Sequence, residues 1–305
     1  MTATQHTLSS AAPLKGVRVL TLALNLPGPA AVMRLQAMGA KCTKLEPLAP
    51  VALNTADPMG IYKPAAYEEM HKGLKVLQAD LKSPRGQAVL HKQLVEADVL
   101  ITSFRPSALV KLGLAWKDLH KRYPALCVVS IVGAAGERAE EAGHDLTYQA
   151  DSGLVNGLEM PASLYADMGG SLFATEAVLQ ALLLRQRPGR AQGKGVFHEV
   201  ALNDASAYLA LPRTWGLTVP HGDVGGAHAG YKVYPCKNGR VAVAALEPHF
   251  AARLCEAAGL GKEAAKHMHK RSTHDGVAQF LATQTRAQLD KLASSKDIPL
   301  HTLPR

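Results

Sequence analysis

The chain has 305 residues, of which 47% are hydrophobic and 19% are charged, a balance typical of a soluble globular protein with a substantial core. No stretch reaches the roughly 18 apolar residues of a membrane-spanning helix, and residues 1–16 lack the pattern of a signal peptide, so we expect a cytoplasmic protein with no membrane partner. The formal net charge of +9 favours anionic ligands. Since no nucleic-acid motif occurs and only 5% of the residues are aromatic, a phosphate-bearing small molecule fits as well as nucleic acid.

The first half of the chain alternates strand and helix patterns. Residues 16–24 are aliphatic and predict a buried strand, and residues 27–40 predict a helix with Pro29 near its first turn and Gly39 at its end. Further strands are predicted at 41–47, 73–81, 98–104 and 125–134, with a loop containing Pro50, Pro58 and Gly60 between the first two of these. Further helices are predicted at 84–97 and 107–123. The alternation predicts an α/β fold with a mainly parallel sheet and helices on both faces.

Ligands of such sheets bind at the carboxyl ends of the strands. The segment after the first strand is NLPGPAA rather than GxGxxG, and GxxxxGK[ST] is absent from the sequence. Neither a dinucleotide cofactor nor a nucleotide-hydrolysing loop is therefore supported. The four cysteines form no CxxC pair, so we expect reduced, partly buried thiols rather than a zinc module or disulfides: Cys42, Cys127, Cys236 and Cys255.

Two polar features of the middle section could carry chemistry. The stretch EAGHDLTYQADSGL, residues 141–154, could be an acid–base cluster or a polar loop. Asp167 precedes a glycine pair and a helical pattern that runs to about Arg187, so its carboxyl is predicted near a helix N-terminus. Such a terminus suits an anion or an enolate oxygen, but the same pattern is typical of a simple N-cap.

From about residue 225 the pattern changes, and a second lobe is predicted to begin between residues 200 and 230. Residues 230–246 predict a hairpin with its turn at Asn238-Gly239, and Glu247 stands just before a helix that Pro248 opens. The rest of the chain after this point has a helical pattern. The basic, His-rich residues 266–274 are interpreted as solvated surface rather than a metal site, because two His two positions apart do not share a helical face.

Seven segments spread over nearly the whole chain occur in the order of one known family. They are PLKGVRVLTLA with PGPAAVMRLQAMGAKCTKLEP, ADLKSPRG, ADVLITSFRPSALVKLGL, VSIVG, GHDLTYQADSGL, LYADMGGSL and GYKVYPCKNGRVAVAALEPHF. In this order they resemble the family III CoA-transferases, also called CaiB/BaiF, and most closely their α-methylacyl-CoA racemase branch.

The resemblance implies a Rossmann-like large domain over residues 1–205 that binds CoA and a smaller α+β domain over residues 206–305. It further implies an acyl-CoA held between them, an interlocked homodimer and a place in lipid metabolism, with no nucleic-acid partner. Family members continue beyond the segment that resembles DIPLHTLP and return to the large domain, and we expect this return segment to be missing.

The resemblance also implies roles for individual residues. Asp167 corresponds to the catalytic carboxylate, His144 to the second acid–base group, and Glu247 to the carboxylate that partners His144. Asp151 corresponds to no fixed acid and is expected to be solvated at a helix edge. The remaining matches are neighbours of the site or CoA contacts: Lys44, Asp80, Arg105, Asp145 and Tyr231.

The implied chemistry agrees with these residue types. Inverting an α-methyl thioester needs one group that removes the α-proton and another that returns a proton on the opposite face, here Asp167 and His144. The enolate needs stabilisation, for which the amides near Gly169 and Gly170 are candidates. No metal or organic cofactor is expected, apart from CoA as part of the substrate.

Two alternatives remain open. In a CoA transferase the same Asp167 would be a nucleophile that forms an anhydride and then an aspartyl-CoA thioester. A non-catalytic acyl-CoA-binding homologue would keep the fold alone. Three positions depart from the family pattern and predict an altered site: Ser163 for Asn, Ser107 for Gly in FRPG, and Gly230 for Tyr.

Overall fold

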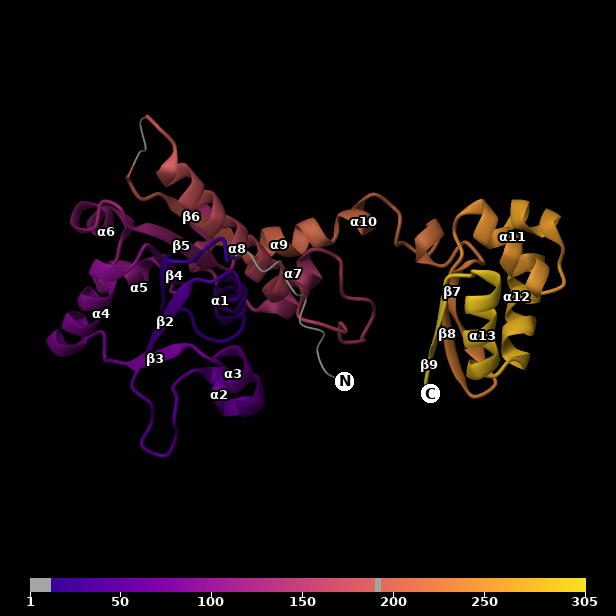
Figure 1. Ribbon diagram of the computed structural model, residues 1–305, viewed down its shortest axis with the longest axis horizontal. Coiled ribbons are helices and arrows are strands. Elements are labelled where there is room, and N and C mark those ends of the chain that lie inside the picture. Colours follow the sequence, from indigo (N-terminus) through magenta and orange to yellow (C-terminus); the bar gives the residue numbers. More distant parts are fainter. Residues whose placement is uncertain (1–11, 190–192) are drawn as a thin grey trace. The chain divides into compact units, whose positions relative to one another are not determined.

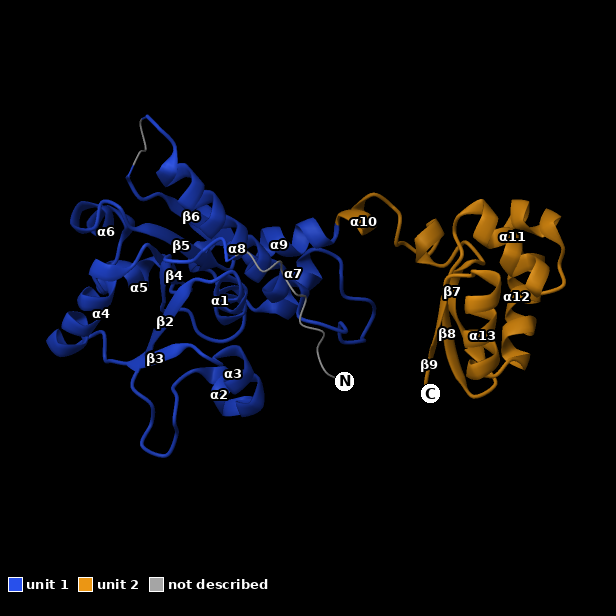
Figure 2. Cartoon of the chain, in the orientation of Figure 1, with its two compact units in different colours: residues 1–210 blue, residues 211–305 orange. Residues whose placement is uncertain are grey.

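The computed structural model describes residues 12–189 and 193–305 and divides into two compact units, Met1–Ala210 and Leu211–Arg305 (Figure 2). The boundary that we placed between residues 205 and 206 falls inside helix α9 (Leu202–Leu209). Residues 1–11, which belong to the stretch read as lacking a signal peptide, lie outside the described residues.

Unit 1 is built on a six-stranded sheet in the order β3-β2-β1-β4-β5-β6, in which every neighbouring pair is parallel. The strands are β1 (Arg18–Thr21), β2 (Lys41–Glu46), β3 (Lys75–Gln78), β4 (Val99–Thr102), β5 (Cys127–Val132) and β6 (Phe197–Ala201). The predicted parallel sheet is confirmed, and the first five strands fall inside the predicted ranges.

Helices cover both faces of this sheet (Figure 1). The helices of unit 1 besides α9 are α1 (Pro27–Ala37), α2 (Pro58–Tyr62), α3 (Pro64–Met70), α4 (Pro84–Glu96), α5 (Pro106–Lys111), α6 (Trp116–Arg122), α7 (Asp145–Asp151) and α8 (Tyr165–Gln186), with a 3-10 turn η1 (Gly136–Glu140). Helices α1 and α8 pack on one face, and α4, α5 and α6 pack on the other.

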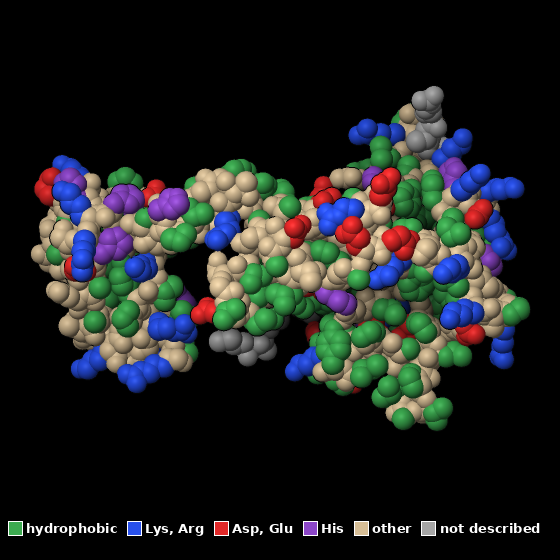
Figure 3. Space-filling model, turned by 180° about the vertical axis from the view of Figure 1, so that it is seen from behind, with side chains coloured by type: hydrophobic (Ala, Val, Ile, Leu, Met, Phe, Trp, Pro, Cys, Tyr) green, Lys and Arg blue, Asp and Glu red, His purple; other side chains and the backbone are tan. Residues whose placement is uncertain are grey.

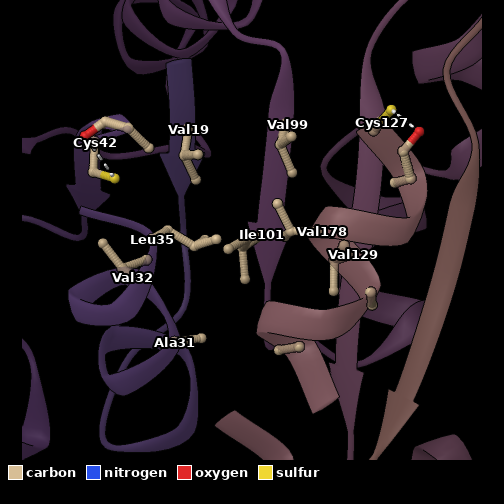
Figure 4. Packing of buried hydrophobic residues seen from close by; sticks show 14 of the residues in the cluster. Val19, Ala31, Val32, Leu35, Cys42, Val99, Ile101, Cys127, Val129 and Val178 are labelled. Carbon is tan, nitrogen blue, oxygen red and sulfur yellow. Dashed lines mark hydrogen bonds between the residues drawn. The ribbon is translucent and has the colours of Figure 1, made fainter. Parts of the chain in front are cut away.

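Alternating side chains of the central strands fill the two cores. Val99 and Ile101 of β4 point to the α1 and α8 side, where they pack with Leu35 and Val178 (Figure 4), whereas Leu100 points to the opposite core. All five of these side chains are fully buried. The continuous apolar strands of the sequence are therefore explained by burial on both faces, as in other parallel sheets.

Three parts of unit 1 differ from the sequence-based expectation. The single helix predicted over 107–123 is two helices, α5 and α6, because Gly113 lies between them and its φ of 69° ends the first helix. Residues 58–70 form α2 and α3 where a loop was expected, and strand β6 was missed.

Unit 2 contains an antiparallel three-stranded sheet in the order β7-β8-β9, packed with helices around its own core. Its elements are α10 (Leu211–Thr214), η2 (Asp223–Gly225), β7 (Tyr231–Cys236), β8 (Gly239–Ala244), α11 (Pro248–Ala257), η3 (Lys262–His267), α12 (Arg271–Thr283), α13 (Arg286–Lys296) and β9 (Leu300–Leu303). The predicted hairpin is confirmed, but residues 300–303 are a strand, although a helical end was expected.

The hairpin turn lies one residue earlier than predicted. Cys236 pairs with Gly239, so Lys237 and Asn238 form the turn and Gly239 belongs to β8. A Cβ at Gly239 would lie 2.3 Å from the Leu303 carbonyl oxygen, so the glycine is needed for the close approach of β9 rather than for the turn itself.

None of the helices formed by residues 12–189 and 193–305 has the length and apolar character needed to cross a lipid bilayer.

The core on the α1 face gives a direct test of the packing. Leu35 is fully buried between α1 and the sheet, so Leu35→Ala should leave a cavity and lower the free energy of unfolding by about 2–5 kcal/mol in urea titrations. Val95→Ala on the exposed side of α4 is the matched control and should change it by less than about 0.5 kcal/mol. Equal effects of the two substitutions would contradict the assigned core.

Candidate active site

Asp167 lies in the first turn of α8, as the sequence predicted. Leu164 occupies the cap position, so Asp167 is the third helical residue and not the N-cap. Only 8% of Asp167 is exposed, and its backbone N–H donates a 3.0 Å hydrogen bond to Oδ1 of Asp145. One of the free amides of the α8 N-terminus is therefore satisfied by a side chain of another helix.

Asp145 connects the two segments that the sequence analysis singled out. It is the first residue of α7 and is 5% exposed. Its other oxygen, Oδ2, accepts a hydrogen bond from the Gln149 side chain, which also donates to the Ser163 carbonyl oxygen at 3.0 Å. Asp145 and Gln149 thus fix the start of α7 to the segment that leads into α8. This segment includes Ser163, the position at which the racemases that the sequence resembles have Asn.

His144 is the cap residue of α7, directly before Asp145, and it is exposed. The Thr147 hydroxyl holds its backbone, because it accepts from the His144 N–H at 3.1 Å and donates to the His144 carbonyl oxygen at 2.7 Å. The imidazole therefore starts from a fixed backbone position, one residue away from the carboxyl that binds the Asp167 amide.

The electrostatics of Asp167 suit proton transfer. Burial, and second the negative charge of Asp145, raise the pKa of Asp167 from 3.8 to about 7. Near neutral pH the carboxyl is then present in both protonation states, which is the condition under which a group can both accept and donate a proton.

A cavity of about 150 Å³ lies where β4 and β5 end and α1 begins. Its walls include Pro27, Ser103, Phe104, Arg105, Gly133 and Tyr148. Arg105 caps α5 and is exposed, so its guanidinium is available to an anionic ligand. The next turn is held by Ser107, the residue that replaces Gly in FRPG, since its hydroxyl donates to Glu140 at 2.9 Å.

Tyr148 is a site residue that the sequence analysis did not name. A Cβ at Gly133 or Gly143 would lie 2.2 or 2.4 Å from its hydroxyl oxygen, so both glycines make room for the phenol. Burial, and second the charge of Asp167, raise the pKa of Tyr148, which keeps the hydroxyl a donor. Its spacing of four residues from His144, one helical turn, was the available signal.

The structure corrects two predictions, the contact of Lys44 with CoA and the enolate contact of the Gly169 and Gly170 amides. Lys44 is fully buried and its amino group binds Asp57 and His71, so it does not reach a ligand on the surface. Gly169 and Gly170 are the fifth and sixth residues of α8, and amides beyond the first turn of a helix bond to carbonyls within it. Their lack of a side chain lets α9 approach, because a Cβ at Gly170 would lie 2.2 Å from Leu202.

Asp80 and Asp151 are both exposed. Asp80 follows β3, and its carboxylate accepts a hydrogen bond from the Lys82 N–H at 2.9 Å, which shapes the turn before α4. Asp151 is the last residue of α7, at a helix edge as expected.

Glu247 and Tyr231 belong to unit 2, so their predicted roles beside His144 stay predictions. Glu247 is exposed and caps α11, as expected, and Tyr231 opens β7 with 36% exposure. The Gly230 that replaces Tyr is explained within this unit, because a Cβ there would lie 2.3 Å from the Ala245 carbonyl oxygen.

The His-rich residues 266–274 lie on unit 2, where Figure 3 shows His side chains among Lys and Arg on one face. His269 pairs with Asp223 at 3.2 Å, and His274 bonds the Ala227 carbonyl oxygen at 2.9 Å. No three His, Cys, Asp or Glu side chains of the described ranges, 12–189 and 193–305, are grouped so that they could hold a metal ion.

Fold and site together define an α/β protein with a parallel sheet and a buried aspartate, Asp167. The backbone N–H of Asp167 is hydrogen-bonded to Asp145, the residue that follows His144. The sequence model of CoA-transferase family III matches residues 14–304, and the chain belongs to this family. The family resemblance seen in the sequence is therefore confirmed.

Curated relatives include two kinds of enzyme. The chain is 31% identical to the α-methylacyl-CoA racemase of Mus musculus over 268 residues, which are 82% of this chain and 66% of the relative. It is 29% identical to the succinate–glutarate CoA-transferase of Agrobacterium fabrum over 273 residues, which are 82% of this chain and 67% of the relative. The chain thus spans about two thirds of the length of these curated relatives.

Solved structures support the fold. A hypothetical protein from Mycobacterium tuberculosis, 22% identical, has a TM-score of 0.79 with 95% of this chain and 85% of that chain covered. A CaiB/BaiF family protein from Brucella suis, 23% identical, has a TM-score of 0.77 with 96% and 84% covered.

The raised pKa of Asp167 predicts how its replacement changes stability with pH. Between pH 3.8 and about 7 the unfolded chain loses the Asp167 proton while the folded protein keeps it, so the stability that this group contributes is lost as pH rises through this window. Asp167→Asn, which cannot ionise, should match the wild type near pH 4 and exceed it above pH 7 by up to about 4 kcal/mol. Urea unfolding at several pH values measures the difference, with Asp151→Asn as the exposed control. A difference that does not change with pH would contradict the assignment.

Proposed function

We propose that this protein acts on an acyl-CoA thioester and inverts the α-carbon of a 2-methylacyl group by 1,1-proton transfer. The observation that carries the proposal is the buried Asp167 carboxyl, whose pKa is about 7, bound through its amide to the residue next to His144. This reaction requires one group of matched acidity and a second proton carrier on the opposite face of the α-carbon, and we propose His144 as the second carrier.

Asp167 and His144 together account for both proton transfers of the reaction. In one direction ionised Asp167 removes the α-proton, the electron pair moves to the thioester oxygen, and protonated His144 returns a proton to the opposite face of the α-carbon. In the other direction the roles exchange. The enolate oxygen needs a hydrogen-bond donor, and because the Gly169 and Gly170 amides lie inside α8, we assign this task to free amides at the start of α7 or α8.

The CoA part of the substrate is assigned to the carboxyl ends of the strands in unit 1. Arg105 stands at the rim of the 150 Å³ cavity, and a guanidinium is suited to phosphate recognition. The formal net charge of +9 favours the approach of an anion such as CoA. We propose no metal or organic cofactor for this chemistry, and the homodimer stays a proposal drawn from the family.

CoA transfer from an acyl-CoA to a carboxylate is the second candidate. It is favoured by the same buried Asp167, since a carboxylate removed from water is a stronger nucleophile, and by the transferase among the relatives at nearly the same identity as the racemase. Asp167 would attack the thioester carbonyl and expel CoA thiolate, which would then attack the anhydride at the Asp167 carbonyl and release the first carboxylate. The acceptor carboxylate would then attack the aspartyl-CoA thioester and expel CoA thiolate, which leaves a new anhydride on Asp167. The thiolate would finally attack the acceptor carbonyl of this anhydride, which forms the new acyl-CoA and regenerates the Asp167 carboxylate.

Solvent isotope exchange tests the first candidate. The wild type in heavy water should introduce deuterium at the α-carbon of 2-methylbutanoyl-CoA, as followed by mass spectrometry. Asp167→Ala and His144→Ala should each lower the exchange rate by roughly 10²–10⁴-fold, because each removes one proton carrier. Asp151→Asn, an exposed acid of the same helix as His144, should leave the rate unchanged.

The outcomes separate the candidates. Absence of α-deuterium with the wild type contradicts the racemase proposal. A new CoA thioester that appears only after a carboxylate such as succinate is added supports transfer. Binding of acyl-CoA without either reaction supports the non-catalytic homologue.

A further inference from the structure

A fully buried ion pair of unit 1 lies outside the residues assigned to the chemistry. Lys44 of β2 and Asp57, the cap residue of α2, form an ion pair whose two side chains are both 0% exposed. Placing two charges in a protein interior is costly unless each is fully hydrogen-bonded. A contact with CoA at the surface does not explain why Lys44 is buried, so the ion pair must have a different role.

The Lys44 amino group contacts the side chains of Asp57, His71 and Tyr67. Besides Asp57, it lies 2.9 Å from Nε2 of His71 and stands over the Tyr67 ring, 5.2 Å from its centroid. His71 Nδ1 lies 2.6 Å from the Tyr67 carbonyl oxygen, which assigns the ring proton to Nδ1 and makes Nε2 an acceptor for Lys44. Lys44 is therefore held as a fixed cation that compensates Asp57.

Asp57 in turn holds the turn after β1. Its two carboxylate oxygens accept from the Asn25 N–H at 3.0 and 3.2 Å, and Oδ1 also accepts from the Met59 N–H at 2.9 Å. Asn25 has a φ of 66°, which is uncommon for a residue other than glycine and is retained where the surroundings enforce it. The Tyr62 hydroxyl, which donates to Asn25 Oδ1, holds the same residue from the other side.

This turn borders the candidate site. Pro27, two residues after Asn25, lines the 150 Å³ cavity together with Arg105 and Tyr148. Asp57 and Asp167 both raise the pKa of Tyr62, after burial, so the Tyr62 phenol stands within electrostatic reach of the catalytic carboxyl. A shift of the Asn25 turn would therefore change the wall of the cavity and not only the interior of the fold.

We propose that the buried Lys44–Asp57 ion pair is a positioning element that fixes the turn of residues 25–27 in the conformation that binds the acyl-CoA. The proposal rests on the proposed function for the identity of the ligand. It assigns Lys44 to the support of the binding turn rather than to direct contact with CoA. Neither Lys44 nor Asp57 takes part in the proton transfer.

The double variant Lys44→Met/Asp57→Leu tests this. It replaces both charges by apolar side chains of similar size, which buried ion pairs often tolerate in stability, but it leaves the Asn25 N–H without its acceptor. We expect a folded protein by circular dichroism whose calorimetric Kd for 2-methylpropanoyl-CoA, per folded molecule, is raised about tenfold. Lys266→Met, which breaks the exposed Lys266–Glu263 pair, is the control and should bind like the wild type.

A pair of substitutions at the turn provides a second test, independent of the stability of the double variant. Gly adopts a φ of 66° without strain and Ala does not, although both lose the Asn25 side-chain oxygen. Asn25→Ala should therefore bind the same thioester at least about threefold more weakly than Asn25→Gly. A general loss of stability lowers the folded fraction and leaves the Kd per folded molecule unchanged.

The binding readout keeps the two proposals apart. Wild-type binding without α-deuterium exchange contradicts the proposed racemase reaction but leaves the positioning role supported if the double variant binds weakly. A folded double variant with the wild-type Kd, or equal Kd values for the two Asn25 variants, would overturn the positioning role. A wild type that does not bind the acyl-CoA overturns both.

Discussion

The hydrogen bond from the Asp167 amide to the Asp145 carboxylate, 3.0 Å long, is the contact on which the site depends. It joins the start of α8 to the start of α7, two helices separated in sequence by residues 152–164. Because His144 directly precedes Asp145, the same bond sets the relation between the two proposed proton carriers. It also places a negative charge beside a buried carboxyl, and this repulsion adds to burial in raising the pKa of Asp167.

Close packing around this contact explains several glycines. Gly133 and Gly143 leave space for the Tyr148 phenol, and Gly169 and Gly170 let α9 lie directly on α8. The packing of α9 on α8 matters for the site, because it holds α8 in place and Asp167 lies buried in the first turn of α8. The glycines beside Asp167 and Tyr148 are thus required here by the side chains that pack against them and not by their amides.

Hydrophobic periodicity predicted the sheet and most of its helices, since strands buried on both faces and helices with one apolar side leave a local signal. Asp167 and Glu247 were placed correctly at helix starts, Asp167 from the helical pattern that follows it and Glu247 from Pro248, which opens the next helix. The burial of Lys44 was not predictable, because its partners Asp57 and His71 come from a segment read as a loop and adjoin it only in the folded chain. Strand β9 was missed because its residues LHTL form no continuous apolar run and directly follow a helical pattern.

The most direct test of the account is the titration of the Asp167 carboxyl itself. Carbon-13 NMR of aspartate-labelled protein, assigned by comparison with Asp167→Asn, should show a midpoint near 7 for Asp167, and the midpoint should fall in Asp145→Asn, where the neighbouring charge is removed. A midpoint near 4 in the wild type would mean that Asp167 is hydrated, and would contradict the buried, charge-coupled site on which the proposed chemistry rests.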